Sequence, residues 1–102
     1  MFGLSKKTDS FMIIEGDEIV IKTRYRLSGR PAGEDKRFHM SEIKAVNFGK
    51  PTVKYMGYIQ LVVDGWDETT GETSVFFGNN TELASANLYK AIDKSVKEYH
   101  EK

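Results

Sequence analysis

The last quarter of the chain constrains the fold most, because residues 80–99 have the pattern of one amphipathic helix. The apolar residues of this segment recur at spacings of three and four and so fall on one face; they are Ala84, Leu88, Ala91, Ile92, Val96 and Tyr99. The charged residues on the opposite face are Lys90, Asp93, Lys94, Lys97 and Glu98. The side-chain oxygen of Asn79 or Asn80 is expected to cap the first turn. Such a helix needs a second element that covers its apolar face.

The part of the chain before this helix has the alternation and the turn signals of β-strands. The segments with a strand pattern are residues 11–15, 18–27, 36–40, 43–48, 55–64 and 73–77. Gly16 and Asp17 predict a tight turn, because glycine tolerates positive φ angles. Ser41 and Glu42 separate two short strands and predict either a sharp corner or one helical turn. Gly57 predicts a bulge or a close approach of the helix to the most hydrophobic strand.

Residues 18–27 alternate most clearly, which is typical of a half-buried strand. The side chains expected to face inward are Ile19, Ile21, Thr23, Tyr25 and Leu27. Those expected to face solvent are Val20, Lys22, Arg24 and Arg26. In the last strand either Val75 and Phe77 or Phe76 points inward, and we expect both faces to be partly covered.

Together these elements predict an α+β fold that is mainly β. Six or seven antiparallel strands with short connections form hairpins, and a strongly twisted sheet bends into two packed layers or a partial barrel. The C-terminal helix caps the open end. Residues 10–102 then form a single domain, and residues 1–9 are either flexible or a short edge strand. A chain of 102 residues is long enough to bury such a core.

Composition limits the class of partner. The chain has 15 basic and 15 acidic side chains, so its formal net charge of zero gives no overall attraction to nucleic acid or membranes. Cysteine is absent, which excludes disulfides and zinc–thiolate sites and fits a reducing cytoplasm. No apolar run reaches the roughly 20 residues of a membrane span, and no apolar stretch of a signal peptide follows the first lysines. We therefore expect a cytoplasmic protein without a transmembrane segment.

Three stretches carry a pattern that goes beyond composition. They are residues 40–46 (MSEIKAV), residues 57–61 (GYIQL), and the Asn79-Asn80 step into the helix with Leu88, Ala91 and Ile92. These stretches resemble the bacterial pleckstrin-homology-like domains, and among them the small uncharacterised bacterial and phage proteins. Over residues 10–100 the resemblance implies a scaffold for protein contacts, lipid headgroups or ring-like self-assembly, and it implies no catalysis. Eukaryotic pleckstrin-homology domains bind inositol phosphates through a basic pair in the first hairpin loop. That loop is the short, acidic Gly16-Asp17 here, so this property does not carry over.

Residues that could perform catalysis or bind a metal are sparse. The two histidines, His39 on a strand face and His100 in a tail expected to fray, lack metal-ligand spacing. The serines have no nucleophile-elbow context. No glycine-rich loop has the lysine and the following helix that cradle a phosphate. The sequence therefore predicts a protein that is not an enzyme and has no cofactor or metal.

A basic segment is the main candidate for anion or partner binding. Its members are Lys22, Arg24, Arg26, Arg30, Lys36 and Arg37. Lys22, Arg24 and Arg26 share one strand face, and Lys36 and Arg37 lie on the next strand. The acidic residues counted against this positive charge are only Glu34 and Asp35. One interpretation is an anion-binding surface for nucleic acid, phospholipid or an acidic protein. The other is a solvated face that prevents edge-to-edge aggregation.

The acidic hairpin at residues 64–72 is a candidate interaction hairpin. Its candidate residues are Asp64, Trp66, Asp67, Glu68 and Glu72. The carboxylates follow no known calcium-loop spacing, so a solvated turn is expected. Trp66 either anchors a partner at the hairpin tip or packs back on the sheet. One acidic and one basic patch on a neutral domain also permit head-to-tail contact between copies.

Two functions follow from these patterns. The favoured one is a non-catalytic protein-interaction or self-assembly module of a bacterial or phage protein, which uses a sheet edge, the hairpin tip or the groove beside the helix. The alternative is an anion-binding adaptor that recognises membrane headgroups or nucleic acid through the basic strand face. Nucleic acid is the weaker ligand, because no exposed aromatic set for base stacking is evident.

Overall fold

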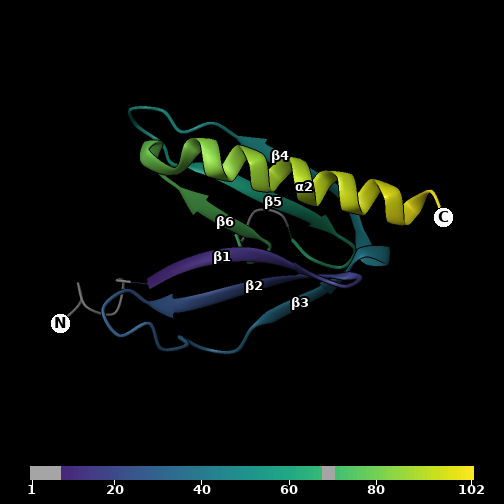
Figure 1. The fold of residues 1–102 in the computed structure, drawn as a ribbon, viewed down its shortest axis with the longest axis horizontal. Helices are drawn as coiled ribbons and strands as arrows, with labels where there is room; N and C mark the ends of the chain where they lie inside the picture. Colours follow the sequence, from purple (N-terminus) through teal and green to yellow (C-terminus); the bar gives the residue numbers. More distant parts are fainter. Residues whose placement is uncertain (1–7, 68–70) are drawn as a thin grey trace.

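The computed structural model describes residues 8–67 and 71–102 and places them in two antiparallel sheets and a C-terminal helix (Figure 1). The strands of the first sheet, in the order β1-β2-β3, are β1 (Thr8–Glu15), β2 (Glu18–Tyr25) and β3 (Lys36–His39). Those of the second sheet, in the order β4-β5-β6, are β4 (Ile43–Gly49), β5 (Gly57–Val63) and β6 (Ser74–Phe77). The helices are the 3₁₀ turns η1 (Met40–Glu42) and η3 (Asn79–Thr81) and the α-helix α2 (Glu82–His100).

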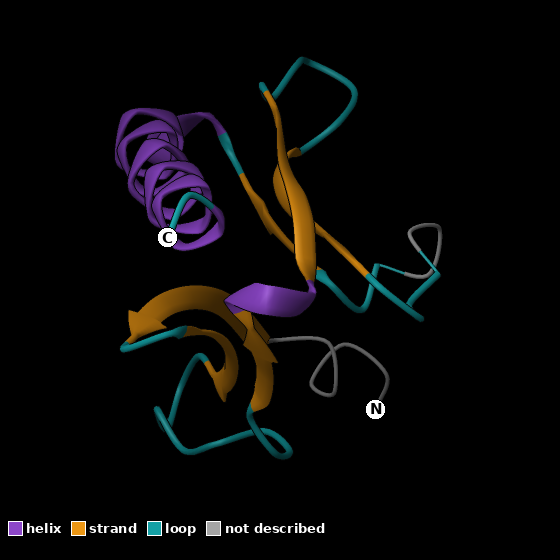
Figure 2. Ribbon diagram, turned by 90° about the vertical axis from the view of Figure 1, so that its right-hand side faces the viewer, coloured by secondary structure: helices purple, strands orange, loops and turns teal. Residues whose placement is uncertain are grey.

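The mainly-β α+β class predicted from the sequence is confirmed, with six antiparallel strands in two layers over the described residues. η1 turns the chain from the first sheet to the second, which confirms the helical turn at Ser41 and Glu42. α2 lies on the open side between the two sheets (Figure 2). This arrangement is compatible with pleckstrin-homology-like topology. Of the expected flexible or edge segment, residues 1–7 lie outside the described residues, and Thr8 and Asp9 belong to β1.

The core forms where the inner faces of the two sheets meet α2. Each described strand, η1 and α2 contribute to its buried side chains, which are Met12, Ile19, Ile21, Phe38, Met40, Ile43, Val46, Ile59, Leu61, Val63, Val75, Phe77, Ile92 and Val96. Ile92 is completely buried, and burial of each methylene group contributes about 0.8 kcal/mol. The helix therefore closes the core, as the apolar pattern predicts.

The buried face of α2 is rotated from the predicted one. The predicted residues that do pack on the core are Leu88, Ile92, Val96 and Tyr99. Ala84 and Ala91, by contrast, are exposed. Tyr89 packs against the core and stacks on Phe48, with ring centroids 5.1 Å apart. An aromatic ring buries far more area than an alanine methyl group, so Tyr89 has the larger effect on the orientation of the helix.

The predicted asparagine cap is wrong. Asn79 and Asn80 lie in η3, and α2 begins after Thr81, whose side chain makes no capping hydrogen bond. The Thr81 hydroxyl donates instead to the carbonyl oxygen of Gly78, at 3.2 Å. Glu82 in the first turn and basic residues in the last turn still complement the helix dipole.

Three side chains of residues 18–27 depart from the predicted alternation. Val20 is buried although it lies on the predicted solvent face, because its register neighbours Ile13 and Arg37 cover it from both sides. Tyr25 and Leu27 were expected inward and are 45% and 89% exposed. β3 does not reach this end of β2, so the inner face there has too few neighbours to bury large side chains.

Gly57 permits a close approach, as predicted, but the neighbours belong to strands and not to the helix. A Cβ atom at this position would lie 2.5 Å from the ring of Phe77 and 2.7 Å from the carbonyl oxygen of Gly49. The sheet irregularity lies elsewhere, between Ile43 and Ala45 of β4.

The outer face of the second sheet is more open than predicted. Val75 and Phe77 of β6 are buried, whereas Phe76 is 54% exposed. Its register neighbour Tyr58 is 37% exposed. The alternation with Val75 and Phe77 inward is therefore the correct one of the two considered.

Candidate functional site

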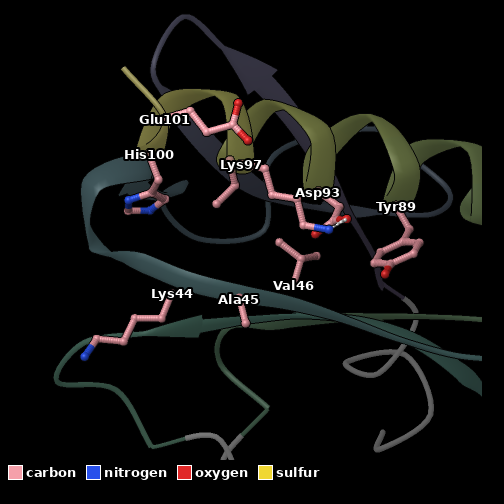
Figure 3. Close-up of a pocket in the computed structure, with 9 residues that line it drawn as sticks. Lys44, Ala45, Val46, Tyr89, Asp93, Lys97, His100 and Glu101 are labelled. Carbon is pink, nitrogen blue, oxygen red and sulfur yellow. Dashed lines mark ion pairs between the residues drawn. The ribbon is translucent and has the colours of Figure 1, made fainter.

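A groove of about 520 Å³ runs between α2 and β4 (Figure 3). Its wall on the strand side is formed by Lys44, Ala45 and Val46. Its wall on the helix side is formed by Tyr89, Asp93, Val96, Lys97, His100 and the following Glu101. Figure 3 shows the Val46 side chain pointing from the strand toward the helix.

The groove follows the edge of β4. It touches the consecutive residues Lys44, Ala45 and Val46 and begins at the sheet irregularity between Ile43 and Ala45. β4 is an outer strand of its sheet, and among residues 8–67 and 71–102 only β5 pairs with it. A strand edge of this kind presents backbone N–H and C=O groups that a further extended chain can pair with.

Two contacts of α2 define the ends of this groove. The Nε2 atom of His100 lies 2.8 Å from the carbonyl oxygen of Ile43; because a carbonyl oxygen only accepts, Nε2 donates. His100 is thus the last residue of an ordered helix and not part of a fraying tail. At the other end, the Tyr89 ring stacks on Phe48. The groove is therefore formed before any ligand arrives.

Three of the charged groups along the groove are already paired. Asp93 and Lys97, one helical turn apart, lie 3.0 Å from each other, and this hydrogen bond raises the pKa of Lys97. Lys44 pairs with Asp64 at 3.0 Å. Glu101 forms no ion pair within the described residues, so one carboxylate at the helix end is available to a ligand in addition to the backbone edge and the apolar side chains.

The sequence interpretation did not identify these residues as a site. It placed Asp93 and Lys97 on the solvated face and His100 in a tail. The signal was present, because Tyr89, Asp93, Val96 and His100 recur at spacings of three and four. That spacing marks a second stripe on the helix beside the apolar one.

The predicted basic residues gather on and beside the first sheet, but carboxylates lie among them. The ion pairs are Lys22–Asp35 (2.8 Å), Arg26–Asp9 (2.9 Å), Arg37–Glu15 (2.9 Å) and Arg37–Glu18 (3.2 Å). The hydrogen bonds to its two glutamates raise the pKa of Arg37. Asp9 and Glu15 belong to β1; the strand was expected beside residues 18–27, but its carboxylates were not counted among those that offset the basic residues. Much of the positive charge on this face is therefore offset within the chain.

The other three predicted basic residues have weaker contacts or none. The Arg24 guanidinium lies over the Phe11 ring, 5.9 Å from its centre. Lys36 donates from Nζ to the backbone carbonyl of Glu72 at 3.3 Å. Across the described part of the chain, the Arg30 side chain makes no ion pair.

Replacement of Lys22 by methionine (Lys22→Met) is expected to raise the pKa of Asp35 toward its ordinary value. The hydrogen bond from Lys22 lowers the pKa of this carboxyl in the folded protein. The pair therefore contributes stability above the unfolded-state pKa of Asp35, and this contribution is lost as the pH falls through the lower, folded-state pKa. A carboxyl-carbon NMR titration measures the shift. Lys94→Met removes an exposed helix charge as a control, and an unchanged Asp35 titration in Lys22→Met would contradict the pairing.

Trp66 packs back onto the protein and does not project from the hairpin tip. Its ring meets the buried Phe38 ring edge-on, with centroids 5.2 Å apart. The contact bridges the two sheets, because Phe38 belongs to β3 and Trp66 follows β5. Of the two alternatives considered for this tryptophan, packing on the sheet is the one observed.

The acidic residues of the predicted interaction hairpin also have partners. Asp64 pairs with Lys44, and Asp67 and Glu72 are likewise engaged. Glu68 lies outside the described residues. Since Lys36 reaches the backbone of Glu72, the basic segment and the acidic hairpin meet within one chain. The wide separation of charge that motivated a head-to-tail contact between copies is therefore smaller than the sequence indicates.

The other histidine has a structural role. Nδ1 of His39 accepts from the backbone N–H of Ser41 at 3.2 Å and so caps η1. Its ring meets the Tyr99 ring edge-on, with centroids 5.4 Å apart. No group of three or more histidine, aspartate or glutamate side chains is placed to hold a metal ion in the segments that the structure describes. No helix in those segments is both long and apolar enough to cross a membrane.

Comparisons with protein-family models, with curated protein sequences and with solved structures find no match to this chain.

Proposed function

We propose that the protein is a non-catalytic interaction module, similar in fold to the small bacterial and phage pleckstrin-homology-like proteins, which binds an extended peptide segment of a partner protein. The observation that carries this proposal is the groove between α2 and the free edge of β4. In this mode of recognition the peptide adds a strand to the sheet. Its main-chain hydrogen bonds provide affinity, and its alternate side chains provide specificity.

The two walls of the groove suit such a peptide. The edge of β4 supplies hydrogen-bonding backbone groups, and the half-buried Tyr89 and the exposed Ala45 supply apolar surface for side chains of the ligand. The Asp93–Lys97 pair and Glu101 provide a polar rim. A mixed apolar and polar lining is typical of protein interfaces.

Crowding the edge of β4 is expected to weaken peptide binding without unfolding the protein. Ala45 is exposed and borders the groove, so a tryptophan there (Ala45→Trp) would crowd the strand edge along which the peptide pairs. Peptides selected from a random library on the wild-type protein are expected to bind Ala45→Trp at least about tenfold more weakly, which corresponds to about 1.4 kcal/mol. Isothermal calorimetry measures the affinity, and amide shifts of residues 44–46 locate the binding.

Ala91→Trp is the matched control, since Ala91 is also exposed but does not line the groove. It should bind the selected peptides like the parent. The proposal fails if no peptide is enriched, or if enriched peptides bind Ala45→Trp as tightly as the wild type.

The alternative predicted from the sequence, an anion-binding adaptor that uses the basic strand face, draws less support from the geometry. Lys22, Arg26 and Arg37 already pair with carboxylates. A phosphate would have to compete with these internal partners for the same cations. Protein interaction is therefore the function that the geometry supports best.

A further inference from the structure

The loop between β4 and β5, residues 50–56, exposes three large apolar side chains. Val53 is fully exposed, Tyr55 is 73% exposed and Met56 is 57% exposed. The sequence pattern assigned Tyr55 to a strand, but β5 begins at Gly57. Single exposed apolar residues are common on protein surfaces, whereas several within one loop mark an interaction site.

Hydrogen bonds fix the shape of this loop. The backbone N–H of Thr52 donates to the carbonyl oxygen of Tyr55 at 2.8 Å. The backbone N–H of Tyr55 donates to Oγ1 of Thr52 at 3.0 Å. This reciprocal pair closes a turn with Val53 and Lys54 at its tip, so binding need not order the backbone that presents the apolar residues.

The start of α2 extends the same surface. Leu83 is 77% exposed and lines a shallow hollow together with Lys50. Asn79 borders both this hollow and the one beneath the loop. Figure 1 shows the loop and the start of α2 at the same end of the molecule. We call this region the tip surface, which consists of Lys50, Val53, Lys54, Tyr55, Met56 and Leu83.

The cations of the tip surface are available to an external partner. In the described part of the chain, neither Lys50 nor Lys54 forms an ion pair. Lys22, Lys44 and Lys97, by contrast, all pair with aspartates. The two lysines of the tip surface lie beside its exposed apolar side chains, and Glu82 and Lys90 line the same hollow as Lys50 and Leu83.

We propose that the tip surface binds anionic lipid headgroups at a membrane surface, with Val53 and Tyr55 entering the headgroup layer and Lys50 and Lys54 facing the lipid charges. Tyrosine is enriched at membrane–water interfaces, and lysines beside an anionic leaflet add to binding. Unlike the groove lysines Lys44 and Lys97, which pair with aspartates, Lys50 and Lys54 form no ion pair within the described residues and can face anionic headgroups. A turn that projects from the surface can also enter the headgroup layer of a membrane, because this fluid layer adapts to the shape of the turn. None of these residues lines the groove along β4, so the proposal goes beyond the proposed function and does not depend on it.

Co-sedimentation of the full chain with lipid vesicles tests this proposal. Binding is expected to phosphatidylcholine vesicles that contain phosphatidylserine and not to pure phosphatidylcholine, and it should weaken as salt rises. The double variant Lys50→Ala/Lys54→Ala is expected to lower the partition coefficient roughly 30-fold. Val53→Ser should lower it as well, because interfacial binding also scales with buried apolar area. The replaced side chains are exposed, so the unfolding curves of these variants should match that of the wild-type protein.

Arg24→Ala/Arg30→Ala is the charge-matched control, because it removes from the first sheet and its loop two cations that have no ion-pair partner among residues 8–67 and 71–102. This variant should sediment with anionic vesicles like the wild type. An equal loss in both double variants would show general charge attraction and overturn the assignment to the tip surface. Absence of vesicle binding would also overturn it. So would a wild-type dimer in sedimentation equilibrium that Val53→Ser abolishes, because a second copy would then be the occupant.

Discussion

Replacement of Ile92 by aspartate (Ile92→Asp) is expected to lower the free energy of unfolding by about 4 kcal/mol or more. Ile92 is completely buried in α2 and belongs to the core cluster that both sheets share. The variant loses these apolar contacts and places a carboxylate in the apolar core. Because domains of this size are stable by roughly 5–15 kcal/mol, the loss is a large share of the stability. Urea unfolding followed by circular dichroism at neutral pH measures it.

The adjacent residue provides the control. Ala91 is exposed on the same helix, so Ala91→Asp should change the free energy of unfolding by no more than about 0.5 kcal/mol. The sequence pattern placed both residues on the buried face, and the pair therefore distinguishes the observed face from the predicted one. A wild-type unfolding midpoint for Ile92→Asp, or a large loss for Ala91→Asp, would contradict the observed packing of α2.

Replacement of Gly57 by valine (Gly57→Val) is expected to destabilise the protein at the upper end of the range of about 1–3 kcal/mol for overpacking. Valine favours strands, so propensity alone predicts a gain in stability. A steric clash nevertheless makes the change destabilising, because a Cβ atom at Gly57 would lie 2.5 Å from the Phe77 ring and 2.7 Å from the Gly49 carbonyl oxygen. The ring is buried and the oxygen belongs to the backbone of β4, so neither can move aside cheaply.

Gly78→Val tests whether space, and not the loss of a glycine as such, causes this effect. A Cβ atom at Gly78 would meet only Asn80 Oδ1, at an ordinary 3.5 Å, and its φ of −100° suits any residue. Thermal unfolding of this variant should resemble that of the parent. Equal stability of Gly57→Val and the wild type would show that β5 and β6 are not packed as described.

The elements of the fold were predictable because each has a clear period and a clear stop signal. Alternation placed Ile19 and Ile21 correctly in the core, and the helical period placed Ile92 and Val96 there. The errors in the expected burial along residues 18–27 share one cause. A period shows which residues share a face but not how far a neighbouring element extends over it, so Tyr25, beyond the reach of β3, was expected to be buried.

The properties of the surfaces could not be predicted from local sequence patterns, because they depend on contacts between residues that are far apart in the chain. The groove end is set by Ile43 and His100, which are 57 positions apart in the chain. The partners of the basic residues follow from the register of β1 and β2, which brings Asp9 opposite Arg24 and within reach of Arg26. Charge counted along the sequence therefore overstated the positive surface of the first sheet and overlooked the lysines beside Val53.

The position of α2 in the chain has a consequence for biosynthesis. All six described strands precede it, so a ribosome produces both sheets before the element that covers them. Until α2 emerges, the nascent chain exposes core side chains such as Ile59 and Leu61 to the surrounding solution. Chaperone binding is therefore most useful to this protein in the interval between synthesis of β6 and completion of the helix.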